Sequence, residues 1–209
     1  MKKLSVIALI VFLAICLNLS FSQEITPPKQ LYFGFSFGFS FFSPTGVNNN
    51  IQNYLDSRGI SITSGTSDII MNITLKANIT YMINESFGLT GMWDMAFAPK
   101  VIVVENGASE SFSFNRFSPG VLGELYLGSK DYRKFMIGIG AFYNLMSFRN
   151  YSASGLSYRL EAGEMIKFSN HRIRLLAVLN IMPPVNSTMT SSPNELNYTD
   201  FGFCVGFDF

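Results

Sequence analysis

The side chain best suited to acid–base chemistry is that of His171, the only histidine in the chain. A hydrolytic site needs such a base hydrogen-bonded to a nucleophile, but His171 ends Ser169-Asn170-His171, a short polar turn in which a solvated histidine is expected. The two cysteines, Cys16 and Cys204, do not make a Cys/His metal cluster. The sequence also has no glycine-rich phosphate loop. It therefore predicts no enzyme, no cofactor and no metal site.

Eight charged residues carry more information than the histidine, because they share one face of the segments in which they occur. Four are basic and four are acidic, and together they are Lys76, Arg116, Arg159, Arg174, Asp94, Glu124, Glu161 and Asp208. A lone buried charge is very costly, so this balance predicts a network of paired ions. We expect Lys76 and Asp94 to form one pair, because a turn centred on Glu85 places them opposite each other on neighbouring strands.

The segments that carry these charges alternate between two kinds of residue. Side chains of a β-strand point to opposite faces in turn, so apolar residues at every second position give the strand one apolar face. The clearest example runs from Phe33 to Phe41, where phenylalanines alternate with glycine and serine. The period of two predicts eight strands, at residues 31–42, 68–83, 87–98, 111–128, 135–148, 156–168, 172–182 and 198–209.

Two residues disturb the alternation. Pro119 interrupts segment 111–128 and predicts an edge or a bulge, because proline lacks a backbone N–H. Glu164 falls on the apolar face of segment 156–168. A bulge near Gly163 would restore the pattern, and so would a position of Glu164 at the polar interface of a membrane.

The connections between the strands alternate in length. Mostly longer loops alternate with short turns. The connections in chain order are 43–67, 84–86, 99–110, 129–134, 149–155, 169–171 and 183–197. Short turns at one end and long loops at the other are typical of transmembrane β-barrels. An even number of strands puts both termini on the side of the short turns, which is then the periplasm.

The composition favours a surface that faces lipid. Charged residues make up 14% of the chain, against about 25% in a soluble domain, and aromatic residues make up 15%, including 21 phenylalanines. A soluble β-sandwich or lipocalin-like barrel also alternates, but it would carry more Lys, Glu and Arg on its strands. The formal net charge of +1 argues against a nucleic-acid partner.

Aromatic residues fall near both ends of the expected strands, as in the two girdles at membrane interfaces. Those at the expected periplasmic ends are Tyr32, Tyr81, Phe87, Tyr126 and Phe135. Those at the expected outer ends are Phe41, Phe97, Phe148, Tyr158 and Tyr198. The sequence thus predicts an all-β fold, an eight-stranded antiparallel up-and-down transmembrane β-barrel.

One loop differs from the rest. In residues 46–59, Ile51, Tyr54 and Leu55 lie at helical spacing and predict one short amphipathic helix. Such a helix would fold over the outer mouth of the barrel. A self-packed cap is the interpretation we favour, and a ligand lid and a contact surface are the alternatives.

The N-terminus matches a secretory signal. An apolar run at 6–19 follows two lysines, and Ser20-Phe21-Ser22 offers small residues where a signal peptidase reads. The run is shorter than the roughly 20 residues that span a bilayer, which weighs against an uncleaved anchor, and the bulky Ile15 weighs against lipidation of Cys16. The predicted parts are a signal peptide at 1–22, a short periplasmic lead at 23–30 and a barrel at 31–209.

The last strand carries the sharpest motif, a terminal aromatic residue preceded by apolar residues at alternate positions. These are Phe201, Phe203, Val205, Phe207 and Phe209. The motif resembles the C-terminal assembly signal of outer-membrane proteins, and with the leader and strand count the chain resembles small barrels of the OmpA/OmpX type, grouped broadly as porin-family or PorT-like proteins. The resemblance implies a Gram-negative outer membrane as location, and membrane lipid and the barrel-assembly machinery as partners. It implies fold more than activity.

Two functions remain for such a barrel. An eight-stranded barrel is just wide enough for side chains to fill, so the first is a non-enzymatic protein with a filled lumen and a structural or surface-interaction role. The second is a narrow channel or a transporter for a small or apolar solute. The sequence names neither a solute nor an extracellular partner, and it leaves the oligomeric state open.

We predict cleavage after Ser22. Protein extracted from the membrane should begin at Gln23, with or without cyclisation of that residue, when its intact mass is measured. A chain that begins at Met1, or one that carries a lipid on Cys16, would contradict the prediction.

Overall fold

The computed structural model describes residues 30–42, 44–64, 68–104, 109–130, 132–149, 151–168, 171–188, 195–196 and 198–209. The predicted signal peptide, its cleavage site at Ser22 and Gln23, and the lead as far as residue 29 lie outside these residues. Gln30, which the sequence assigned to the lead, is the first residue of a strand. Within the described ranges, no helix is long and apolar enough to cross a membrane.

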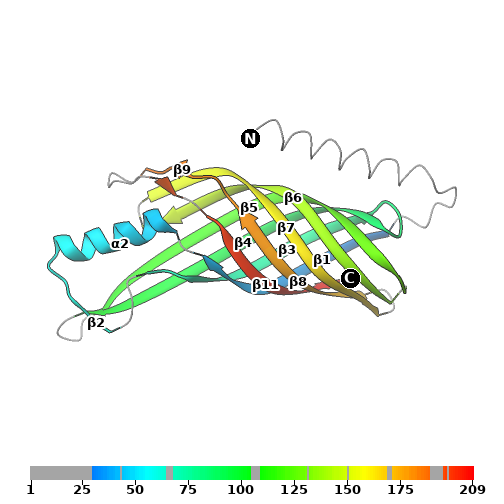
Figure 1. The fold of residues 1–209 in the computed structure, drawn as a ribbon, viewed down its shortest axis with the longest axis horizontal. Coiled ribbons are helices and arrows are strands. Elements are labelled where there is room, and N and C mark those ends of the chain that lie inside the picture. The colour runs from blue at the N-terminus through cyan, green and yellow to red at the C-terminus, as the bar shows by residue number, and fades with distance from the viewer. Residues whose placement is uncertain are drawn as a thin grey trace.

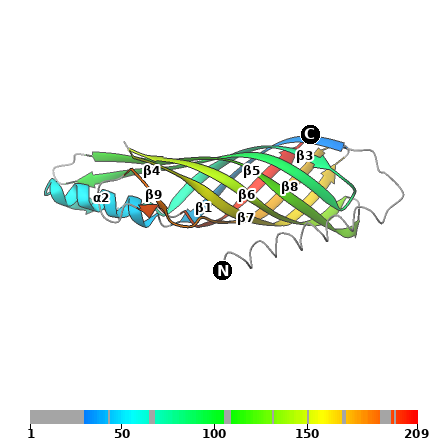
Figure 2. The same cartoon turned by 90° about the horizontal axis from the view of Figure 1, so that it is seen from above.

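Eight long antiparallel strands form a closed barrel (Figure 1, Figure 2). Each strand pairs with its neighbours in the chain, and the last strand pairs with the first. No backbone edge is therefore left unpaired in lipid, as a membrane-spanning sheet requires. The strands are β1 (Gln30–Phe42), β3 (Met71–Met82), β4 (Phe87–Val104), β5 (Ser109–Lys130), β6 (Arg133–Phe148), β7 (Tyr151–Phe168), β8 (His171–Ile181) and β11 (Asp200–Asp208).

The outer face of the barrel wall is apolar and the inner face is polar, as a membrane-spanning barrel requires. Along β3, Met71, Ile73 and Leu75 are exposed, whereas the residues between them are polar and buried. The same alternation runs along β11, where Phe203 is 48% exposed and Asp208 is fully buried. An apolar outside around a polar inside is the reverse of a soluble barrel. The soluble sandwich and the lipocalin-like barrel are thus ruled out for this chain.

Several strands extend further toward the outer end than the sequence pattern indicates. The prediction of a loop at 149–155 is wrong, because β7 begins at Tyr151 and this residue pairs directly with Phe148 at the end of β6. Arg149, next to this pair, takes a φ of 52°. β4 likewise continues to Val104, within the loop expected at 99–110. The extension of β7 carries Ser152 and Ser154 on its outward face, so it lacks the apolar alternation by which the membrane strands are recognised. The extension of β4 begins at Pro99, which the sequence assigned to a loop, although Val101 beyond it is apolar and 62% exposed.

Neither expected irregularity produces a bulge. The pairing of β5 with β6 keeps one register from Phe117 to Gly120, on both sides of Pro119. β7 is also regular through Gly163. Glu164 points outward, where its carboxylate accepts a hydrogen bond of 2.6 Å from Arg133, and both side chains are exposed. Of the two explanations for Glu164, a position at the polar interface is therefore the correct one.

Six of the ten aromatic residues assigned to girdles lie on the outside of the barrel or are partly exposed. The other four are buried inside and correct the prediction: Tyr32, Tyr126, Phe148 and Tyr198. Their place near a strand end was right, but Tyr32, Tyr126 and Phe148 stand at even positions of strands whose odd positions face lipid. The position of a residue along a strand sets how deep its side chain lies in the membrane. Whether its number is odd or even sets the face of the barrel wall on which the side chain lies.

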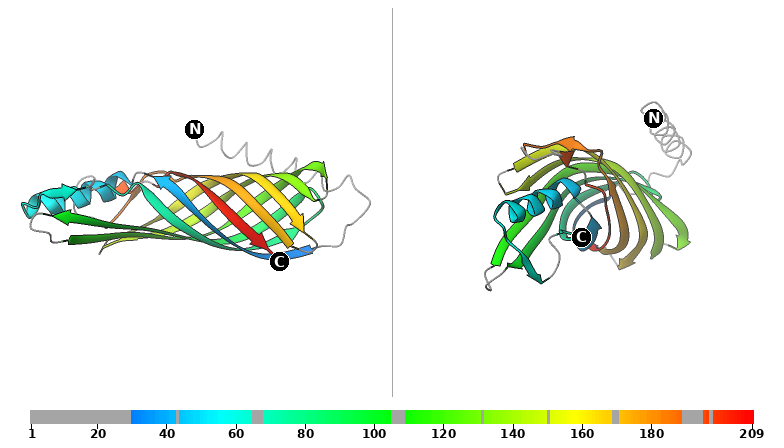
Figure 3. Two further views of the ribbon diagram at one scale, coloured as in Figure 1. Left: turned by 90° about the horizontal axis from the view of Figure 1, so that it is seen from below. Right: turned by 60° about the vertical axis from the view of Figure 1, so that its left-hand side comes forward.

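The helix expected at 46–59 is α2 (Thr45–Ser57), which lies at the end of the barrel opposite the C-terminus (Figure 3). Its Val47, Ile51 and Leu55 are fully buried. Three short strands accompany it at this outer end. They are β2 (Ile62–Ser64), which pairs with the end of β4, and the two-residue strands β9 (Val185–Asn186) and β10 (Glu195–Leu196).

Phe209 closes the seam between the last strand and the first. Its backbone N–H donates to the carbonyl oxygen of Phe33 at 2.8 Å, and its own carbonyl oxygen accepts from the Phe33 N–H at 3.1 Å. Its ring centroid lies 5.9 Å from that of Phe35 and 5.5 Å from that of His171, and the side chain is 56% exposed. Substitution of the ring would thus leave the backbone pairing in place.

We predict that Phe209→Ala impairs assembly in cells more than it impairs stability. Deletion of Phe209 also removes its two backbone hydrogen bonds to Phe33, so the comparison uses the substitution. Loss of one ring at a wet interface should cost only about 1–2 kcal/mol, so refolding in detergent, measured by heat-modifiable migration, should persist. Insertion into outer membranes should fall several-fold. The matched control is Phe135→Ala, which removes a similarly exposed phenyl ring, at 47% against 56%, from β6. Equal loss in both assays would make Phe209 a packing residue, and normal insertion would contradict the assembly signal.

Candidate functional site

The eight charged residues singled out in the sequence all lie inside the barrel, and each is at most 5% exposed. Two further charges, Arg172 and Asp200, are buried with them at 2% each. Both stand at even-numbered positions of strands whose even-numbered residues face inward. This alternation was the signal that would have found them. Among the described residues the interior thus holds five basic and five acidic side chains.

The outer group of ions is centred on Asp94. One of its carboxylate oxygens accepts hydrogen bonds from Arg116, at 3.0 Å, and from Arg159. Arg116 also lies 3.7 Å from a carboxylate oxygen of Asp200. One carboxylate therefore balances two guanidinium groups that come from β5 and β7, and a second carboxylate shares the charge of one of them.

Lys76 has a different partner from the one expected. The register is as predicted, because Lys76 stands directly opposite Asp94 on the neighbouring strand and both side chains are buried. The Lys76 ammonium nevertheless donates to Glu161, at 3.1 Å, from the far side of the barrel. In a barrel this narrow a long side chain reaches across the interior, and the two arginines hold Asp94 instead.

The inner group of ions is centred on Arg174, nearer the periplasmic end. Its guanidinium lies 2.9 Å from Asp208 and 3.3 Å from Glu124. Arg172 lies 3.1 Å from the second oxygen of Asp208. The Tyr126 hydroxyl donates to Glu124 at 2.5 Å. Hydrogen bonds and counter-ions together neutralise each buried charge, as a dry interior requires.

Aromatic rings and amides occupy the space between the ions. The guanidinium of Arg159 lies 3.9 Å from the ring centroid of Phe142, and that of Arg116 lies 4.1 Å from the ring centroid of Tyr198. A void of only about 10 Å³ remains beside Asp94, which is about the space that one water molecule needs. At this level the lumen is filled by side chains.

A hydrophobic plug lies above the ions, toward the outer end. It joins the buried face of α2 to rings on the inside of the barrel, where Phe42, Phe114 and Tyr198 pack against one another with centroid distances of 5.0–5.7 Å. The Asn48 side chain anchors the helix through two hydrogen bonds to the backbone of Ile69, of 2.8 and 3.2 Å. The outer mouth is thus closed by an apolar layer as well as by the helix.

The remaining candidate for chemistry, His171, lies at the opposite end of the barrel and is exposed, with its ring against Phe209. Cys204 is buried in β11, and its sulfur lies 3.6 Å from the Lys76 ammonium. Within the described parts of the chain, no three or more His, Cys, Asp or Glu side chains gather as a metal site would need.

We predict that breaking one ion pair in the lumen costs more stability than removing both of its members. Glu161→Gln leaves the Lys76 ammonium buried without its counter-ion and should cost about 3–5 kcal/mol, whereas Lys76→Met with Glu161→Gln should cost less than that single change. Urea unfolding in lipid vesicles is followed through Trp93, the only tryptophan, which faces outward. A double variant as unstable as the sum of the singles would show that the two groups do not interact.

Comparison with known proteins supports the fold. No family model and no curated protein matches the sequence. Among solved structures, Neisserial surface protein A is similar with a TM-score of 0.59 and 12% identity, over 87% of this chain and 98% of that one.

Two other solved structures resemble the chain less closely. OprG from Pseudomonas aeruginosa has a TM-score of 0.45 and 14% identity, over 89% of this chain and 99% of that one. Ail from Yersinia pestis, solved with the heparin analogue sucrose octasulfate, has a TM-score of 0.42 and 12% identity, over 86% and 99%. With its apolar outer wall and closed eight-stranded sheet, this chain has the fold of the small outer-membrane β-barrels.

Proposed function

We propose that this protein is a non-enzymatic outer-membrane barrel with a closed lumen, and that its capped outer end serves a structural or surface-interaction role. The observation that carries the proposal is the double closure of the interior. Ion pairs fill the membrane-embedded part, and the apolar plug under α2 fills the outer mouth. A solute would have to displace both layers to pass.

The outer end offers groups with which an external partner can form hydrogen bonds. Beside α2 a polar hollow of about 240 Å³ is lined by Tyr54, Arg149, Tyr151 and two asparagines of the helix. The Arg149 guanidinium lies 4.2 Å from the ring centroid of Tyr54, so packing holds this cation in place. Rigid aromatic and arginine side chains are those that most often anchor protein contacts. This arrangement supports a contact role for the cap, together with its structural role.

A narrow channel is the alternative, and the charged lumen is the observation that favours it. Five basic and five acidic side chains line the interior of the described barrel. Ions could pass only if α2 moved away and the salt bridges exchanged partners.

We expect the refolded protein to show no discrete conductance steps in planar lipid bilayers. A variant in which a short Gly/Ser linker replaces residues 45–57 should also stay silent, because the ion pairs beneath the helix still fill the lumen. Heat-modifiable migration serves as the check that both proteins are folded. Steps in the wild-type protein would overturn the closed lumen in favour of the channel, and steps in the linker variant alone would assign the seal to α2.

A further inference from the structure

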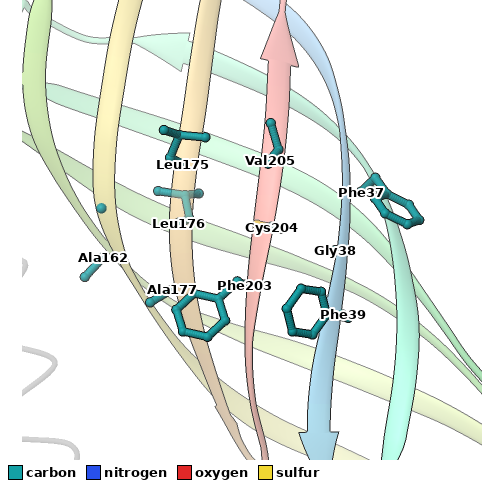
Figure 4. A pocket seen from close by; sticks show the side chains of 11 residues that line it. Phe37, Gly38, Phe39, Ala162, Leu175, Leu176, Ala177, Phe203, Cys204 and Val205 are labelled. Atoms are coloured by element: carbon teal, nitrogen blue, oxygen red, sulfur yellow. The ribbon is translucent and has the colours of Figure 1, made fainter.

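The outer wall of the described barrel carries an apolar groove that the closed lumen does not explain. It is open to the surroundings, has a volume of about 460 Å³ and runs over β7, β8, β11 and β1 (Figure 4). Ala162 and Ala177 contribute methyl groups to it, and Leu175, Phe203 and Phe39 contribute large side chains.

The groove results from the register of small and large residues. Ala162 stands opposite Ala177, which in turn stands opposite Phe203, so two methyl groups adjoin a phenyl ring in one row around the barrel. In the next row toward the outer end, Leu160 stands opposite Leu179. Large side chains therefore surround a recess that is two strands wide. Its lining is continuous with the lipid-facing belt, in which Leu175 and Phe203 are 45% and 48% exposed.

A charged pair lies at the periplasmic end of this groove. Glu164 stands directly opposite Leu175, one of the groove residues, and it faces outward. It binds Arg133, whose side chain is 59% exposed and comes from the first position of β6, next to a short periplasmic turn. Exposed charges on the outward face mark the level at which the hydrocarbon ends. The Nε and Nη2 groups of Arg133 donate to Glu164, so the exposed guanidinium presents its other terminal nitrogen, Nη1, to a phosphate group at that level.

We propose that this groove binds an acyl chain of an inner-leaflet phospholipid, whose phosphate contacts Arg133. Lipid tails are as apolar as leucine, so apolarity alone does not favour a bound lipid over its neighbours in the bilayer. Selection comes from the fit of one flexible chain into the recess, combined with the cation at its polar end. A second copy of the barrel is a poorer fit, because the phenyl rings beside the recess hold a flat wall away from its alanine floor.

Native mass spectrometry tests the site directly. The full-length protein is refolded into nanodiscs of phosphatidylglycerol and phosphatidylethanolamine and released with graded collisional energy. The wild-type protein should retain one phospholipid, with phosphatidylglycerol enriched. Ala177→Leu, which fills the recess, should reduce the retained fraction about tenfold, and Arg133→Gln should remove the preference for the anionic lipid. Glu164→Gln frees Arg133 from its carboxylate and should raise that preference.

The control is Ala141→Leu, which enlarges an outward-facing alanine of β6 that lies outside the groove, and it should retain lipid as the wild type does. Heat-modifiable migration confirms that each variant is folded. Equal lipid retention by Ala177→Leu and the wild type would overturn the proposal. So would a dimer that Ala177→Leu abolishes, because the occupant would then be a second copy. The result does not depend on the conductance experiment, because the groove lies outside the lumen.

Discussion

β1 and β11 lie at opposite ends of the barrel sequence, yet their backbones pair over nine consecutive residue pairs, from Gly34 with Asp208 to Phe42 with Asp200. Lipid offers no hydrogen-bond partner for a free sheet edge, so this seam is the condition under which the other strands can exist in a membrane. The strands approach closely there. A Cβ added to Gly38 would lie 2.3 Å from the carbonyl oxygen of Phe203, and one added to Gly202 would lie 2.2 Å from that of Phe39.

Closure with eight strands fixes the width of the interior, and this width in turn dictates the chemistry of the lumen. Long side chains from opposite walls meet in the middle, so every inward charge must find its counter-ion among the other inward side chains. Arg174 bridges Asp208 and Glu124 in this way, and Asp94 serves two arginines. The equal number of buried acids and bases is thus a consequence of barrel size, and it makes each pair depend on its neighbours.

The sequence predicted the eight strands, the inward face of each charge and the helix over the outer mouth, because these depend on periodicity within one segment. It did not predict which ions pair. Lys76 and Asp94 do stand opposite each other, but the choice of Glu161 by Lys76 depends on distances across the lumen that no local pattern contains. The lipid-facing groove was missed for a similar reason, since it arises only when Ala162 and Ala177 of neighbouring strands come into register.

The irregular pattern of β5 has a physical cause in the two surroundings that the strand crosses. Toward the periplasm its outward side chains are apolar, as at Val121, and its inward ones include Glu124. Beyond Arg116 the polarity reverses, because Ser111 and Ser113 face outward while Phe112 and Phe114 are buried. The first arrangement suits lipid outside an ionic lumen, and the second suits water outside an apolar core. One strand thus follows two opposite burial patterns without a break in its backbone, and they change near residue 115, where the ionic lumen gives way to the apolar core under α2.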